Sequence, residues 1–147
     1  MSLKEKLMED LKTSMKNKDI LRKNTITMVR AAIKQEEVDK RIDLDDEGII
    51  QIMGKQLKEK RNSIEEFKKG NRQDLVDQAE AEIAILLEYL PKQLTEEELT
   101  EIVKEVLDQG GYTSMKDMGK IMKDVMPKVQ GKADGNMVNQ VVRKILA

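Results

Sequence analysis

Apolar residues recur at helical spacing in seven separate segments of this chain, and this periodicity constrains the fold more than any other feature. In the first segment, for example, Leu3, Leu7 and Leu11 lie on one face of an expected helix. No segment shows the strict alternation of apolar and polar residues that is typical of a half-buried strand. The sequence therefore predicts an all-α protein.

A proline and a helix-capping sequence mark the main boundary in the chain. Pro91 ends the fourth helix, because its ring cannot continue the hydrogen-bond ladder. Shortly afterwards, Thr95 and Glu98 have the spacing of a capping box, which predicts the start of a new helix. We therefore expect an N-terminal four-helix domain, residues 1–92, followed by a small C-terminal three-helix domain, residues 93–147.

Polar residues, glycines and prolines place the other helix ends. The third helix is expected to begin near Asp45, a good N-cap residue, and to end at Gly70. The sixth is expected to begin near Ser114 and to end at Met126, directly before Pro127. Aromatic residues are scarce, so we expect leucine, isoleucine, valine, alanine and the ten methionines to fill the core.

The composition excludes most catalytic machinery. The chain has no cysteine, histidine or tryptophan, which removes cysteine nucleophiles, serine–histidine triads, imidazole bases and cysteine or histidine zinc sites. We assign no catalytic residue, no cofactor and no metal site. Carboxylates, lysines and a bound metal can still do acid–base work, so the composition favours a binding protein without abolishing the enzyme alternative.

No apolar run approaches the length of a membrane span, and the first residues carry charges where a signal peptide would be apolar. We therefore expect a cytoplasmic protein with no membrane partner.

The net charge of −1 hides a strong segregation of charge along the chain. Residues 70–108 hold 11 acidic and 3 basic residues, whereas residues 110–147 hold 7 basic and 3 acidic. Residues 1–41 are also basic, with 11 basic and 7 acidic residues. An acidic middle thus separates two basic ends, and the basic ends are candidates for binding an anionic partner.

Three lysines of the sixth helix, Lys116, Lys120 and Lys123, are expected opposite its apolar face. Like charges at this spacing destabilise a helix by about 0.2–0.5 kcal/mol per pair, and an anionic partner would relieve that cost. A merely solvated surface explains the stripe about equally well. Glycines of the region would let a phosphate approach the backbone closely. The predicted nucleic-acid-binding residues are Lys116, Gly119, Lys120, Lys123, Lys128, Gly131, Lys132, Gly135, Arg143 and Lys144.

Two further features are weaker candidates. A second basic arc on the second helix consists of Arg22, Lys23, Arg30 and Lys34, but Glu37 lies in the same arc. The shortage of aromatic residues argues against stacking on single strands, so structured RNA gripped through its phosphates fits better. Tyr112 is the one aromatic residue near the lysines, and a half-buried loop anchor explains it better than base stacking.

Several motifs together resemble the YqeY family, and the resemblance runs along the whole chain. The motifs are Arg30-Ala-Ala-Ile-Lys34, Arg72-Gln-Asp-Leu75 followed by Glu80 and Glu82, Glu88-Tyr-Leu-Pro-Lys-Gln-Leu94, Asp117-Met-Gly-Lys-Ile-Met122, and Gly131-Lys-Ala-Asp-Gly135 followed by Val138 to Leu146. The chain is identified as a stand-alone bacterial member of this family.

The family resemblance implies a function in tRNA handling. The YqeY domain is similar to the C-terminal tail of the B subunit of glutamine-dependent aminoacyl-tRNA amidotransferase, which contacts tRNA but lies outside the catalytic parts. We therefore expect a tRNA-binding accessory protein, with a possible protein partner in tRNA aminoacylation or amidation. Two alternatives stay open: a helical protein–protein adaptor, and a residual role in glutamine-dependent carbon–nitrogen ligation on tRNA.

Overall fold

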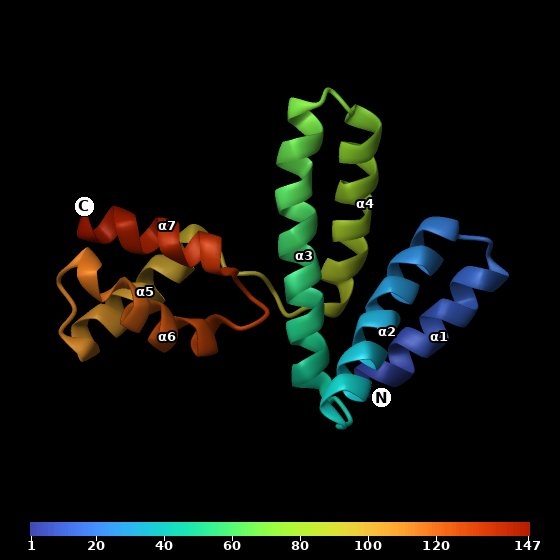
Figure 1. Ribbon diagram of the computed structural model, residues 1–147, viewed down its shortest axis with the longest axis horizontal. Helices are drawn as coiled ribbons and strands as arrows, with labels where there is room; N and C mark the ends of the chain where they lie inside the picture. Colours follow the sequence, from blue (N-terminus) through green and yellow to red (C-terminus); the bar gives the residue numbers. More distant parts are fainter. The chain divides into compact units, whose positions relative to one another are not determined.

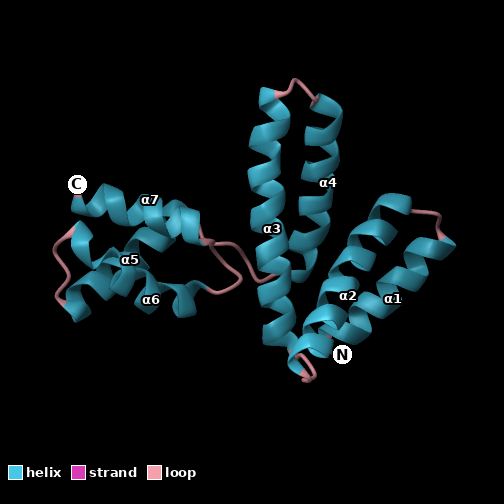
Figure 2. Cartoon of the chain, viewed as in Figure 1, coloured by secondary structure: helices cyan, strands magenta, loops and turns pink.

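The computed structural model describes all of residues 1–147, and its regular elements are all helices (Figures 1 and 2). The elements in chain order are α1 (Leu3–Lys16), α2 (Ile20–Lys40), α3 (Asp46–Lys69), α4 (Gln73–Tyr89), α5 (Glu96–Gly110), the 3₁₀ turn η1 (Met115–Asp117), α6 (Met118–Val129) and α7 (Gly135–Leu146). The predicted all-α class is therefore confirmed. None of the helices combines the length and the apolar character that crossing a bilayer requires.

The chain divides into two compact units, Met1–Leu90 and Pro91–Ala147. The N-terminal unit holds α1 to α4: α1 packs along α2, α3 packs along α4, and α2 contacts both α3 and α4 (Figure 1). The C-terminal unit holds α5, α6 and α7, each of which contacts the other two. The structure places the division after Leu90, whereas the sequence placed it after residue 92.

Branched aliphatic residues and leucine fill the core of the N-terminal unit. Its fully buried side chains include Leu7, Ile26, Val29, Ile49, Met53 and Leu86. Methionine contributes to both cores, as expected, although only Met53 is fully buried: Met118, Met122, Met126 and Met137 are partly buried against the core of the C-terminal unit. Met15 and Met28 are 57% and 52% exposed, because other side chains take the buried positions of their helices: Leu7 and Ser14 on α1, and Thr25, Ile26, Val29 and Ile33 on α2.

The C-terminal unit has a separate core, which is made of aliphatic side chains from its three helices. The fully buried members are Leu99, Val103, Ile121, Val125, Val129, Val138 and Val142. The predicted capping box at the start of α5 is confirmed: the Glu98 amide donates to Thr95 Oγ1 at 3.1 Å, and the Thr95 amide donates to Glu98 Oε1 at 3.2 Å. Two amides at the helix start thus gain acceptors.

The sixth helix differs from the prediction at both ends. Ser114 caps the 3₁₀ turn η1, and the α-helix begins only at Met118. Pro127 lies inside α6, which continues to Val129. A proline in the last turn removes one backbone hydrogen bond, but Val129 is fully buried, so its packing in the core favours continuing the helix.

Candidate nucleic-acid interface

The buried face of α6 determines which of its side chains reach solvent. Ile121, Val125 and Val129 recur every four residues and are fully buried, which fixes the orientation of the helix in the C-terminal unit. As a consequence, Lys120 and Lys123 lie on the exposed side, as predicted. Lys116, Lys128 and Lys132 are also exposed, and we call these five residues the lysine patch.

One member of the lysine patch does not lie where the sequence suggested. Lys116 belongs to the 3₁₀ turn η1, whereas Lys120 and Lys123 belong to α6. The three lysines therefore do not share one continuous α-helix, because the α-helix begins only after Asp117. Gly119 lies between them and is exposed, and a Cβ atom added to it would meet no other atom within 4 Å. A ligand can thus come close to the backbone at this point.

The ammonium groups of the lysine patch have no acceptor within the protein. None of the five side chains takes part in an ion pair or a hydrogen bond. Elsewhere in this unit, Lys144 pairs with Glu96, and Arg143 Nε donates to Asn139 Oδ1 at 2.6 Å. The predicted residue Lys144 is therefore engaged in an ion pair, whereas Arg143 bonds to a neutral amide and keeps its positive charge uncompensated, as the lysine patch does.

Two of these lysines border a hollow between α5 and α6. The hollow has a volume of about 380 Å³ and is lined by Val106, Gln109, Gly110, Lys123, Asp124, Pro127 and Lys128. Its single carboxylate, Asp124, accepts a hydrogen bond from the Tyr112 hydroxyl at 2.7 Å. Two lysines and one carboxylate thus line the hollow, and this excess of positive charge suits an anionic group there.

The loop before α7 does not form the phosphate cradle that its glycines suggested. The amides of Lys132 and Ala133 both donate to the Val129 carbonyl, at 2.8 and 3.0 Å. Gly131 has a φ of 76°, and its carbonyl accepts from Gln93 Nε2 at 2.7 Å. The loop amides after Gly131 are therefore occupied by the fold, because this turn closes back on the end of α6.

Gly135 is also not a loop residue, because it is the first residue of α7. The Asp134 carboxylate caps this helix and accepts from the Met137 amide at 2.9 Å. A phosphate at this helix start would meet a group of like charge. The structure thus leaves the lysine side chains, and not the glycine backbone, as the anion-binding feature of the C-terminal unit.

Tyr112 takes the role of a half-buried loop anchor, as the sequence favoured. Its hydroxyl donates to Asp124, and this hydrogen bond is the main reason that the pKa of Tyr112 is raised. Its ring fits directly against Gly110, where an added Cβ atom would lie 2.2 Å from the ring. Because the ring is held in place by these contacts, Tyr112 is not free to serve as a stacking platform for bases.

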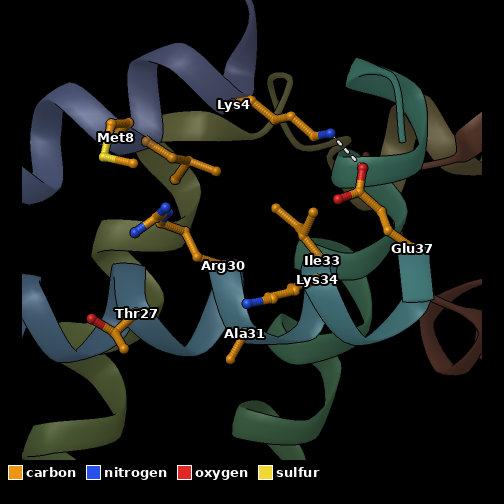
Figure 3. Close-up of a pocket in the computed structure, with 9 residues that line it drawn as sticks. Lys4, Met8, Thr27, Arg30, Ala31, Ile33, Lys34 and Glu37 are labelled. Carbon is orange, nitrogen blue, oxygen red and sulfur yellow. Dashed lines mark hydrogen bonds and ion pairs between the residues drawn. The ribbon is translucent and has the colours of Figure 1, made fainter. Parts of the chain in front are cut away.

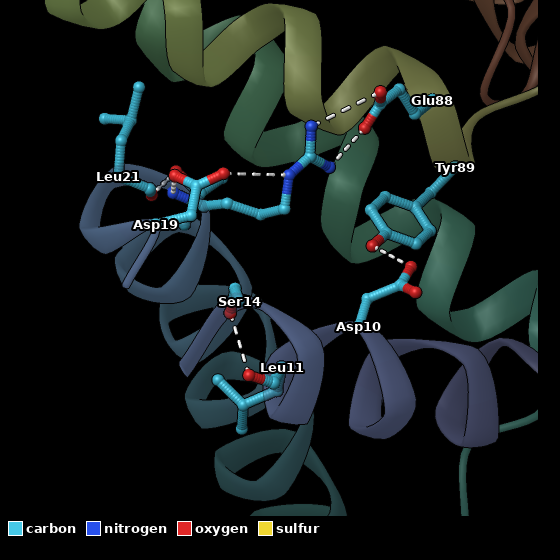
Figure 4. A network of polar contacts seen from close by, with 9 residues as sticks. Asp10, Leu11, Ser14, Asp19, Leu21, Glu88 and Tyr89 are labelled. Carbon is cyan, nitrogen blue, oxygen red and sulfur yellow. Dashed lines mark hydrogen bonds and ion pairs between the residues drawn. The ribbon is translucent and has the colours of Figure 1, made fainter. Parts of the chain in front are cut away.

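The fold engages one residue of the second basic arc, Arg22, in ion pairs with neighbouring carboxylates. Arg22 pairs with Glu88 at 2.5 Å and with Asp19 at 3.5 Å, and the hydrogen bond to Glu88 is the main cause of its raised pKa. The Tyr89 hydroxyl beside it donates to Asp10 (Figure 4). These contacts fasten the end of α4 to α1 and α2, so Arg22 has a structural role.

The ionisable groups that the fold perturbs keep their usual charge at neutral pH. Burial, followed by the hydrogen bond to Asp10, raises the pKa of Tyr89, which therefore stays protonated. Hydrogen bonds from the backbone and side chain of Thr95 lower the pKa of Glu98, which stays ionised. No three acidic side chains converge into a group that could hold a metal ion. The pKa of Tyr89 and the pKa of Glu98 are both shifted away from neutral pH, whereas a general acid or base works best with a pKa near neutral pH.

Comparison of the sequence with known families identifies the family of this chain. A family model described as Yqey-like protein matches residues 4–146. The chain belongs to the YqeY family. This membership extends across both units and confirms the resemblance seen in the motifs.

Curated relatives of this YqeY chain include fungal proteins named "Altered inheritance of mitochondria protein 41, mitochondrial". The one from Pyrenophora tritici-repentis is 30% identical over 144 residues, which cover 96% of this chain and 79% of the fungal protein. The one from Lachancea thermotolerans is 44% identical over 85 residues, which cover 57% of this chain and 46% of the relative. The chain thus spans about half the length of the Lachancea protein. The fungal relatives are named as mitochondrial proteins, and the cytoplasmic location of this chain stays a prediction.

A third relative is part of an enzyme. The E subunit of the glutamyl-tRNA(Gln) amidotransferase of Thermococcus sibiricus is 48% identical over 46 residues, which cover 31% of this chain and 7% of that protein. The relationship to an amidotransferase that the motifs indicated is therefore present over a short segment. This match is to the E subunit of such an enzyme, whereas the motifs suggested the tail of the B subunit.

Proposed function

We propose that this YqeY protein binds tRNA through contacts between the lysine patch and RNA phosphates. The observation that carries the proposal is the set of five exposed ammonium groups without any acceptor in the protein. Phosphate contacts of lysine depend on charge and are independent of base sequence. The protein therefore grips structured RNA by its backbone and does not read bases.

The amidotransferase relative supports tRNA as the RNA. Its name describes an enzyme that acts on glutamyl-tRNA(Gln), and 46 of its residues align with this chain at 48% identity. The proposal assigns binding alone to this chain, because its composition lacks a cysteine nucleophile and its perturbed tyrosines stay protonated. Any amide transfer would belong to a partner enzyme.

The direct test compares tRNA affinity among three forms of the full chain. The test variant is Lys116→Gln/Lys120→Gln/Lys123→Gln, in which glutamine keeps the helix propensity and removes the charge. The matched control is Lys12→Gln/Lys55→Gln/Lys68→Gln, which removes three exposed charges from the N-terminal unit. Both variants lose the same net charge, so a difference in tRNA affinity between them reflects where the lost charges lie on the protein.

We expect the test variant to bind tRNA on the order of 10–100-fold more weakly at about 0.15 M salt, with a similar loss for different tRNA species. The control should stay within about twofold of the unmodified protein, and circular dichroism should show the same helix content in all three. An equal loss of tRNA affinity in both variants would mean that binding depends on the net charge of the protein alone, and the lysine patch would then not be the binding site.

A further inference from the structure

A groove with a volume of about 660 Å³ runs between α1 and α2 in the N-terminal unit (Figure 3). The buried side chains Leu7 and Ile33 form its floor. Its other lining residues are Lys4, Met8, Thr27, Arg30, Ala31, Lys34 and Glu37. The groove therefore combines an apolar floor with three cations and one carboxylate.

The only carboxylate of the groove is already occupied. Glu37 pairs with Lys4 and also accepts from the Leu44 amide at 2.7 Å. Arg30 and Lys34 have no hydrogen bond or ion pair in the structure. Glu37 thus does not neutralise its neighbours on α2, and two cations one helical turn apart, about 6 Å along the axis, are left without a partner.

Exposed methionines extend the apolar surface of the groove along α1. Met8 and Met15 lie seven residues apart on one face of α1 and are 36% and 57% exposed. On α2, Ala31 lines the groove and is exposed as well. Methionine side chains adapt their shape to different partners. The apolar surface thus continues along α1 for about two helical turns, roughly 10 Å, with the two cations of α2 beside it.

We infer that the groove between α1 and α2 binds an acidic amphipathic helix of a partner protein. Such a helix places apolar anchors at i, i+3 or i+4 and i+7 in a groove, here against Met8 and over Leu7 and Ile33. Carboxylates one turn apart on the same helix meet Arg30 and Lys34, because their spacing along the axis is the same. This site lies on the N-terminal unit and is independent of the lysine patch.

The test uses two synthetic helical peptides and the full chain. One peptide of about 18 residues carries leucines at helical spacing and glutamates one turn apart beside them, and the other replaces those glutamates by glutamine. The groove variants are Arg30→Gln/Lys34→Gln, which removes the two cations, and Ala31→Glu, which adds a carboxylate at an exposed helical position. The matched control is Lys16→Gln/Lys23→Gln, in which both changed residues are exposed and lie outside the groove.

We expect the glutamate peptide to bind the unmodified protein about tenfold more tightly than the glutamine peptide and to shift the methyl resonances of Leu7, Met8 and Ile33. Each groove variant should weaken binding of the glutamate peptide about tenfold or more, while the control should leave it unchanged. Circular dichroism of the four proteins should be the same.

Three results would overturn the inference. The first is equal affinity for the two peptides, or equal affinity of the groove variants and the control. The second is groove-dependent binding of octanoate or of phosphatidylserine vesicles without binding of the glutamate peptide, which would assign the groove to a small acid or a membrane surface. The third is self-association of the chain that Arg30→Gln/Lys34→Gln abolishes, which would make the groove an interface between copies.

Discussion

At the scale of single residues, Glu37 shows how one contact sets the electrostatics of a surface. Its pKa is lowered, first by the hydrogen bond from Lys4 and then by that from the Leu44 amide. We predict that Lys4→Met raises the Glu37 pKa toward its ordinary value, because the larger of the two donors is lost. Titration of the Glu37 carboxyl by NMR measures this, with Lys12→Met as the control; an unchanged pKa would contradict the assignment.

The same contact gives the sign of a pH effect on stability. A carboxyl whose pKa is lower in the folded state stabilises the fold above its unfolded pKa, about 4.3 for glutamate. That stabilisation is lost as the pH falls through the lower folded value. The unmodified protein should therefore lose more stability between neutral and acid pH than Lys4→Met does.

The partner of Glu37 could not be read from the sequence. The sequence placed Glu37 in the basic arc of α2 and counted it against that arc. In the fold, Lys4 reaches Glu37 from 33 residues earlier in the chain and holds it at one end of the groove. Such a pairing depends on how α1 packs on α2, which periodicity alone does not determine.

At the scale of helices, replacing either of two glycines by alanine should change the free energy of unfolding, and the two changes should have opposite signs. Gly54 lies in the middle of α3, and a Cβ atom there meets nothing within 4 Å. Gly54→Ala should therefore stabilise the protein by about 0.5–1 kcal/mol through helix propensity. Gly110→Ala should destabilise it, because the Cβ atom would lie 2.2 Å from the Tyr112 ring. Urea unfolding followed by circular dichroism measures both, and effects of the same sign would contradict the packing described.

Helix ends were predictable where local contacts decide them. Thr95 and Glu98 cap α5 as expected, because both partners of the capping box lie within one turn. Gly111, with a φ of 66°, follows the end of the same helix in the left-handed conformation that glycine adopts readily. The end predicted from Pro127 is wrong, because α6 continues to Val129, whose side chain is buried against the other helices of the C-terminal unit.

At the scale of the whole molecule, the two units have separate cores, so truncating a buried side chain in one unit should destabilise that unit alone. Val125 is fully buried in the core of the C-terminal unit, and Val29 is 1% exposed in that of the N-terminal unit. Val125→Ala should cost about 2 kcal/mol and speed amide exchange in residues 91–147, while residues 1–90 keep their protection. Val29→Ala should do the reverse. Hydrogen exchange by NMR resolves the units, and acceleration spread over the whole chain by either change would contradict their independence.

The sequence predicted which charged side chains of the candidate site are exposed, but it did not predict which backbone amides of the site are already hydrogen-bonded. Exposed lysines follow from the apolar period of the sixth helix, so Lys120 and Lys123 lie where expected. The expected roles of Gly131 and Gly135 depended on free loop amides, but the turn closes on Val129 and the Asp134 carboxylate caps α7. Composition suggests a phosphate cradle in such cases, whereas only the fold shows which amides are already bonded.

The salt dependence of tRNA binding tests the central claim most directly. If the lysine patch contacts phosphates, the logarithm of the association constant should fall linearly with the logarithm of salt concentration between about 0.05 and about 0.3 M. Each lost contact should flatten the slope by roughly 0.7–0.9, so the Lys116→Gln/Lys120→Gln/Lys123→Gln variant should be flatter by about 2–2.7. The control variant of Lys12, Lys55 and Lys68 should keep the original slope. A slope that is the same in the unmodified protein and in the patch variant would contradict the account, because the lysine patch would then release no counterions from tRNA.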